Sequence, residues 1–215
     1  MKYVIFDMDG VLFDTEGLTM QSWVETAARY GMEGADEVFK RCIGTNEITT
    51  IEIFIEAYGD KYPMRQIKDE QEVLYQKNLR LNGPIKKPYS NYILEYLTTH
   101  GYEIALASST YYNDVMYEIK ATGFDKYFKH VIGGDMVSNA KPDPEIFLKA
   151  AALLGCKPEE AFIIEDSYNG IRAAHEAGGH PIMVPDMLPP TDEMKELAES
   201  IEPDLKAALE YIINH

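Results

Sequence analysis

The feature that most constrains the fold is an alternation of short apolar runs with helical patterns. Apolar, β-rich runs occur at residues 3–6, 103–107, 131–132, 161–164 and 181–184. Helical spacing lies between them, for example over residues 143–154, and Gly155 then ends that pattern. Strands that are apolar throughout and alternate with helices are typical of parallel sheets with both faces covered. The sequence therefore predicts an α/β fold with a Rossmann-like, doubly wound parallel sheet.

One segment, residues 16–81, breaks this alternation. It contains apolar stripes at helical spacing, such as Met20, Trp23 and Ala27, and no strand-like run. We therefore expect an all-helical cap domain over residues 16–81, inserted into a core domain of residues 1–15 and 82–215. The hinges would lie at residues 13–16 and 82–84. The chain of 215 residues with 46% hydrophobic side chains is long enough for one sizeable core and such an insert.

Composition limits the partners. The formal net charge of −16 would repel phosphate backbones and anionic lipid, so we expect neither nucleic acid nor a membrane as a partner. No stretch approaches the roughly 20 apolar residues of a membrane span. Asp7 and Asp9 interrupt the first apolar run before the hydrophobic region of a signal peptide could form. Cys42 and Cys156 are far apart in the sequence, and we expect both to be reduced thiols. We expect a cytoplasmic protein.

Polar side chains follow four of the predicted strands, where ligands bind in open parallel sheets. Each group has a structural alternative: the Asp7–Gly10 stretch suits a turn, the hydroxyls and carboxylates suit helix caps, and a loop lysine suits solvent. Four such coincidences at one edge of one sheet are not expected. The groups are Asp7 and Asp9, Ser108 to Thr110, Lys141, and Glu165 with Asp166.

The charges indicate the chemistry of this edge. Four carboxylates in one pocket need a compensating cation, and oxygen ligands beside a phosphate favour Mg²⁺. With Lys141, that cation would supply the positive charge that the acidic chain lacks. Ser108 would donate to a phosphate oxygen. One carboxylate can attack phosphorus to form an aspartyl-phosphate, and another can serve as general acid to the leaving oxygen.

At these residues the sequence resembles the haloacid dehalogenase superfamily. The matching motifs occur in the expected order: Asp7-Met8-Asp9-Gly10-Val11, Ser108, Lys141-Pro142 and Glu165-Asp166-Ser167. A tail from Gly170-Ile171 through Ala177-Gly178 also agrees, and the resemblance covers the whole chain. The branch with a helical cap after the first motif is the most similar one. It includes β-phosphoglucomutase and many small sugar-phosphate phosphatases.

The resemblance implies a Mg²⁺-dependent phosphatase that acts on a small phosphorylated metabolite, a sugar or polyol phosphate. Asp7 would be the nucleophile and Asp9 the general acid and base. Ser108, Ser109 and Lys141 would bind the phosphoryl group. The implied metal ligands are Asp7, Asp9 through its backbone carbonyl, and Asp166, with Glu165 either a further ligand or a residue that contacts the ligands. The candidate specificity residues of the cap are Glu16, Thr19, Thr45, Asn46 and Glu47. We expect a monomer, because the cap must move freely.

Four other functions agree less well with the sequence. Asp9 argues against halide displacement, because the dehalogenases lack that second aspartate. A β-phosphoglucomutase-type mutase is disfavoured by Thr19, where the mutase has a histidine, and by Glu47, where the corresponding loop carries an arginine. A signalling receiver domain is disfavoured as well. Its phosphoacceptor follows the third strand in the sequence and it has no helical insert, whereas here the aspartates follow the first predicted strand and a helical segment comes after them. A non-catalytic structural protein would not need every motif residue.

Overall fold

The computed structural model describes residues 2–43, 45 and 47–215. The chain divides into two compact units, Met1–Phe13 with Lys86–His215, and Asp14–Ile85. We refer to the first as the core unit and to the second as the cap unit. The domain boundaries expected from the sequence are at residues 15/16 and 81/82, and they stay a prediction.

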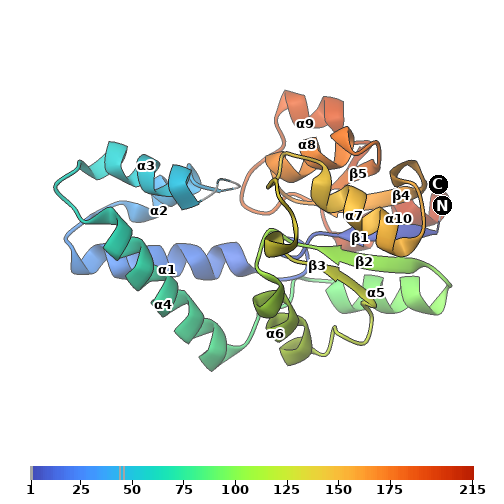
Figure 1. Cartoon of the computed structure of the whole chain (residues 1–215), viewed down its shortest axis with the longest axis horizontal. Helices are drawn as coiled ribbons and strands as arrows, with labels where there is room; N and C mark the ends of the chain where they lie inside the picture. The colour runs from blue at the N-terminus through green and yellow to red at the C-terminus, as the bar shows by residue number, and fades with distance from the viewer. Residues whose placement is uncertain (1, 44, 46) are drawn as a thin grey trace. The chain divides into compact units, whose positions relative to one another are not determined.

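The core unit is built on one parallel sheet in the order β3-β2-β1-β4-β5-β6 (Figure 1). Tyr3 at the start of β1 pairs with Glu103 on one side and with Ala161 on the other, so β1 is central. The strands are β1 (Tyr3–Phe6), β2 (Glu103–Ala107), β3 (His130–Ile132), β4 (Ala161–Glu165), β5 (His180–Met183) and β6 (Ser200–Ile201).

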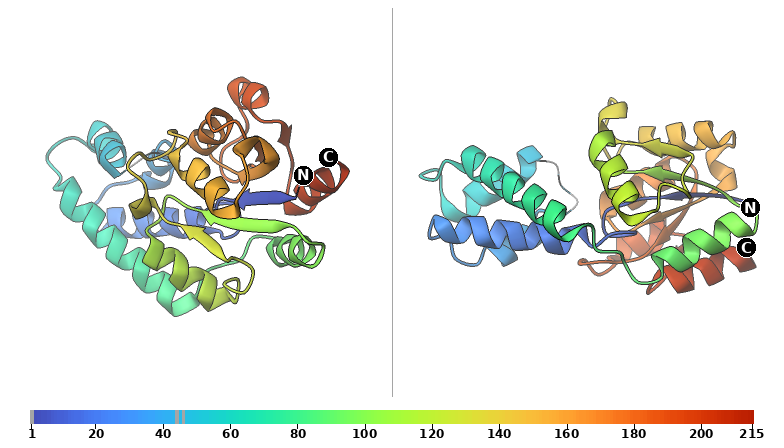
Figure 2. Two further views of the ribbon diagram at one scale, coloured as in Figure 1. Left: turned by 45° about the vertical axis from the view of Figure 1, so that its right-hand side comes forward. Right: turned by 90° about the horizontal axis from the view of Figure 1, so that it is seen from below.

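Helices cover both faces of this sheet, as Figure 2 shows. Val4 and Phe6 of β1 point to the face of α5, α6 and α10, whereas Ile5 points to the face of α7 and α8. The bounds are α5 (Ser90–Thr99), α6 (Tyr112–Thr122), η1 (Gly134–Met136), α7 (Glu145–Leu154), η2 (Pro158–Glu160), α8 (Tyr168–Glu176), α9 (Asp192–Leu197) and α10 (Leu205–Asn214). The predicted doubly wound fold is confirmed.

Two local details differ from the sequence-based expectation. Helix α7 begins at Glu145, one residue later than a helix with Asp143 as N-cap and Pro144 in its first position, and Asp143 Oδ1 accepts a hydrogen bond of 3.0 Å from the Glu145 N–H. Gly155, with φ of +73°, ends that helix as predicted. Strand β6 was not predicted, because Ser200–Ile201 is too short to produce a periodic pattern.

In the described residues the cap unit consists of helices and their connections, as the sequence indicates. They are α1 (Thr15–Arg29), α2 (Ala35–Lys40), α3 (Glu47–Tyr58) and α4 (Met64–Asn82). Asp14 caps α1 by accepting from the Gly17 N–H, and Trp23 stacks on Phe54 in the centre of the unit with ring centroids 4.0 Å apart. Across the residues that the structure describes, no helix combines the length and hydropathy needed to cross a membrane.

Candidate active site

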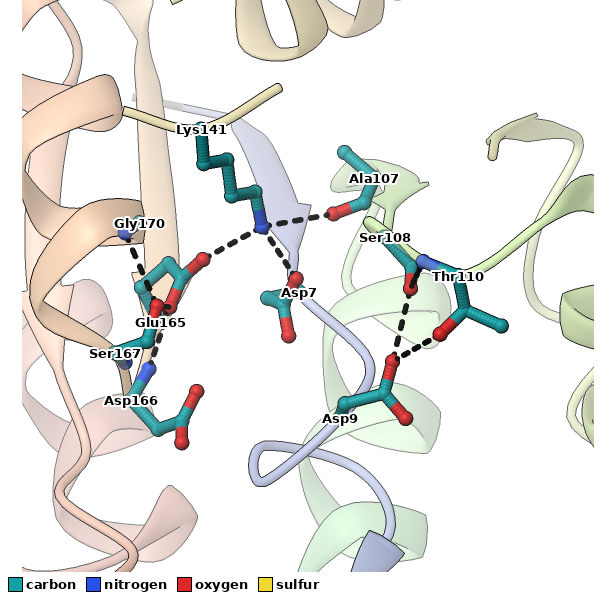
Figure 3. Close-up of polar contacts among 10 residues, drawn as sticks. All are labelled: Asp7, Asp9, Ala107, Ser108, Thr110, Lys141, Glu165, Asp166, Ser167 and Gly170. Carbon is teal, nitrogen blue, oxygen red and sulfur yellow. Dashed lines mark hydrogen bonds and ion pairs between the residues drawn. The ribbon is translucent and has the colours of Figure 1, made fainter. Parts of the chain in front are cut away.

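The centre of the predicted site is a buried lysine held between two carboxylates (Figure 3). Asp7 follows β1, Glu165 ends β4, and Lys141 reaches both from the loop after β3. The Lys141 Nζ lies 2.5 Å from Asp7 Oδ1 and 2.6 Å from Glu165 Oε1. The three side chains are only 8%, 7% and 1% exposed, so both contacts are shielded from solvent.

Burial and charge act against each other in this cluster. Burial raises the pKa of Asp7 well above its usual range, and the charges of Glu165 and Asp9 add to the rise against the opposing effect of Lys141. Burial alone would lower the pKa of Lys141, but the charges of Asp7 and Glu165 outweigh it and raise that pKa. Lys141 therefore remains a cation.

Glu165 is fixed by its neighbours in the chain. Its Oε2 accepts from the N–H groups of Asp166 and Ser167, both at 2.9 Å, and from Ser167 Oγ at 3.0 Å. Ser167 also caps α8 by accepting from the Gly170 N–H. A Cβ on Gly170 would lie 1.8 Å from Glu165 Cδ, so the glycine leaves the space that the carboxylate occupies.

A third carboxylate completes the cluster. Oxygen atoms of Asp7, Glu165 and Asp166 lie within 4.8 Å of one another, and all three residues are buried. Gly10, at φ of +78°, makes room beside them, because a Cβ there would lie 2.3 Å from Asp166 Oδ2. Three carboxylates against one lysine leave a net negative charge, and hard oxygen donors in that number fit a Mg²⁺ ion.

Asp9 has a different environment from Asp7. Two hydroxyl groups donate to the same oxygen of Asp9, Oδ2: Ser108 Oγ at 3.0 Å and Thr110 Oγ1 at 2.8 Å (Figure 3). Sequence reasoning missed Thr110 as a partner of Asp9. The alternation of side chains along an extended strand could have found it, since residues two apart point the same way.

The structure brings together most of the predicted site residues that belong to the core unit. Asp7, Lys141, Glu165 and Asp166 form the buried cluster, and Ser108 contacts Asp9. Ser109 is exposed, and its proposed role in binding phosphate stays a prediction.

The predicted specificity residues belong to the cap unit, and their role stays a prediction. Thr19 donates to the Thr15 carbonyl at 2.9 Å, and Thr45 donates to the Cys42 carbonyl at 2.7 Å. Glu16 is half-buried in the first turn of α1, and Glu47 is exposed at the start of α3. Asn46 lies outside the described residues.

A buried, carboxylate-rich site at the carboxyl edge of a doubly wound sheet, with a helical unit inserted after β1, is the arrangement of an α/β protein that binds its ligand at the ends of its strands. The family model described as haloacid dehalogenase-like hydrolase matches residues 4–184. The chain belongs to this family, and the resemblance drawn from its motifs is confirmed.

Individual relatives agree with this assignment. The chain is 33% identical over 182 residues to a phosphorylated carbohydrates phosphatase of Thermotoga maritima, covering 83% of this chain and 82% of the relative. It is also 33% identical over 182 residues to the pyrophosphatase PpaX of Listeria welshimeri, covering 81% and 78%. A solved structure from Thermotoga maritima, described as a candidate β-phosphoglucomutase, superposes with a TM-score of 0.82 at 29% identity and covers 100% of this chain and 99% of that one.

Proposed function

We propose that this protein is a Mg²⁺-dependent phosphatase that hydrolyses a small sugar or polyol phosphate through an aspartyl-phosphate intermediate. The observation that carries the proposal is the separation of two aspartates: Asp7 lies in the buried cluster with Lys141, whereas Asp9 is bound by hydroxyl groups. Similarity to the phosphorylated carbohydrates phosphatase supports the substrate class.

The carboxylates of Asp7, Glu165 and Asp166, with the backbone carbonyl of Asp9, would hold the metal ion. When bound, Mg²⁺ supplies positive charge to the phosphoryl oxygens and keeps its carboxylate ligands ionised. Lys141 contributes a second, fixed positive charge at Asp7, and Ser108 provides a hydrogen-bond donor for a phosphoryl oxygen. The chain is strongly acidic, so this local positive charge is what admits an anionic substrate.

In the first step, an oxygen of Asp7 attacks phosphorus, and the bond from phosphorus to the ester oxygen breaks as Asp9 gives that oxygen its proton. In the second step, Asp9 takes a proton from a water molecule that attacks the same phosphorus atom. The bond from phosphorus to Asp7 then breaks, which releases inorganic phosphate and restores the Asp7 carboxylate.

The proposal is tested by measuring hydrolysis of p-nitrophenyl phosphate with Mg²⁺. Asp7→Asn should abolish activity and leave the circular dichroism spectrum unchanged, because the amide is a poor nucleophile of nearly the same shape. Asp125→Asn, at an exposed position of the core unit, is the matched control and should remain active. Activity that survives in Asp7→Asn, or in excess EDTA, would contradict the proposal.

A sugar phosphomutase is the second candidate, favoured by the similarity to the candidate β-phosphoglucomutase. Glu47, at the start of α3 in the cap unit, argues against it, because its carboxylate would repel the second phosphate of a bisphosphate intermediate. Incubation with β-glucose 1-phosphate and a trace of the 1,6-bisphosphate separates the two functions. A phosphatase releases free phosphate faster than glucose 6-phosphate appears, and a mutase gives the reverse.

A further inference from the structure

The hydroxyl group of Ser108 has one proton to donate, but two different acceptors require it. Its oxygen accepts from the Thr110 N–H at 3.0 Å, and its single proton is donated to Asp9 Oδ2 at 3.0 Å. The proposed function requires Ser108 to donate to a phosphoryl oxygen. Because a hydroxyl has one proton, Ser108 must then release Asp9. Some other group has to hold the Asp9 carboxyl while the substrate is bound.

Thr110 is placed to do this. Its Oγ1 donates to the same atom, Asp9 Oδ2, and does so at the shorter distance of 2.8 Å. Thr110 is also fixed through both groups of its own backbone: its N–H donates to Ser108 Oγ, and its carbonyl accepts from the Gly134 N–H at 2.8 Å. The threonine hydroxyl is therefore presented to Asp9 from a fixed segment between β2 and α6.

The choice of oxygen matters for proton transfer. Both hydroxyls bind Oδ2, and Oδ1 of Asp9 receives no hydrogen bond from any residue that the structure describes. Figure 3 shows Asp9 turned toward Ser108 and Thr110 through one oxygen, with the other oxygen directed away from them. A carboxyl held through Oδ2 keeps Oδ1 available for the oxygen atom that leaves the substrate.

We propose that Thr110 is the positioning residue of Asp9, holding its carboxyl through Oδ2 when the Ser108 hydroxyl turns to the phosphoryl group. This inference rests on the proposed function, since it assigns proton transfer to Asp9. Thr110 touches neither phosphorus nor the leaving group and acts only through Asp9. A carboxyl that is free to rotate would spend less time in line with the leaving oxygen, which lowers the rate of proton transfer.

The effect of Thr110 must then depend on the leaving group. p-Nitrophenolate is a stable anion and leaves with little help from an acid. Phenolate from phenyl phosphate is a much poorer leaving group and depends on protonation in the step that forms the aspartyl-phosphate. The value of kcat/KM reports this step for both substrates, and the two substrates differ by only one nitro group. A general loss of structure would lower both values equally.

The experiment compares Thr110→Val and Thr110→Ser with the wild type on the two aryl phosphates. Thr110→Val should lower kcat/KM about tenfold or more for phenyl phosphate and about threefold or less for p-nitrophenyl phosphate. Thr110→Ser keeps the hydroxyl and should stay within about threefold of the wild type on both. Thr122→Val removes a hydroxyl that donates to backbone carbonyls of α6, and it is the matched control.

An equal loss on both substrates, no loss at all, or a Thr110→Ser variant as impaired as Thr110→Val would overturn the inference. If valine is not accommodated and that variant does not fold, Thr110→Ala removes the same donor without the second methyl group and is read by the same ratio. A wild type that is inactive on both substrates overturns the proposed function and, with it, this inference. An active wild type with a uniform loss in the variants overturns the inference alone.

Discussion

Glu118 in α6 is a buried acid that the proposed mechanism does not use. Its side chain is 1% exposed, and its Oε2 finds no hydrogen-bond partner among the residues that the structure describes. Burial raises the pKa of Glu118 from an ordinary value of 4.5 to about 8, and the negative charges of Asp9 and Asp114 add to the rise. Because the pKa is higher in the folded state than in the unfolded state, the contribution of Glu118 to stability is fully present below pH 4.5 and is lost as the pH rises through about 8.

The substitution Glu118→Gln removes this titration and keeps the shape of the side chain. The cost of holding the glutamate in the folded protein is less than about 1 kcal/mol at pH 5, about 3 kcal/mol at pH 7 and close to about 5 kcal/mol at pH 9. A glutamine has no such cost at any of these values. The stability of Glu118→Gln relative to the wild type should therefore rise by about 4 kcal/mol between pH 5 and pH 9.

Urea unfolding followed by far-ultraviolet circular dichroism measures this difference at both pH values, with EDTA present throughout. The titration of Asp7 affects both proteins and cancels in the comparison. Glu95→Gln, at an exposed position of α5 in the same unit, is the matched control for replacing a glutamate by glutamine. A relative stability of Glu118→Gln that changes by less than about 1 kcal/mol across this range would refute the reasoning.

Two further substitutions test the buried cluster. Gly170→Ala places a methyl group 1.8 Å from Glu165 Cδ. Although alanine is the better helix former, the substitution should destabilise the protein by about 1–3 kcal/mol, and thermal unfolding measures this loss. A melting temperature equal to that of the wild type would contradict the prediction. Lys141→Met leaves the buried carboxylates of Asp7 and Glu165 without their cation, so it should cost roughly 3–5 kcal/mol in urea unfolding and abolish phosphatase activity. The exposed Lys149→Met is its control and should lose less than about 1 kcal/mol.

The sequence predicts those parts of this molecule that rest on burial and chain direction. Val4 to Phe6 are fully buried because β1 lies between two other strands, and an uninterrupted apolar run is the direct mark of such a position. Asp7 and Glu165 could be placed together because parallel strands bring their carboxyl ends to one edge. Neither inference needs side-chain geometry.

Features that depend on the path of the backbone beyond a strand were missed. Ser108, Ser109 and Thr110 look equivalent in the sequence, but the first and third bind Asp9 and the second is exposed. Glu118 carries no signal either, because its burial arises from the packing of α6 on elements distant in sequence. Periodicity does not identify which cap residues contact a substrate either, so the predicted specificity residues of the cap stay a prediction; periodicity shows only which side chains enter the core of the cap unit.

The central position of β1 also has a consequence for the order in which the chain folds. Tyr3 pairs with Glu103 and with Ala161, so the strand that precedes the cap unit has both of its partners after it. During synthesis the cap segment, Asp14–Ile85, leaves the ribosome before β2 and β4 do. It can collapse around Trp23 while β1 is still unpaired. Asp7 therefore meets Glu165 only after β4 has emerged, and we expect a nascent molecule to acquire metal-binding capacity later than it folds the cap segment.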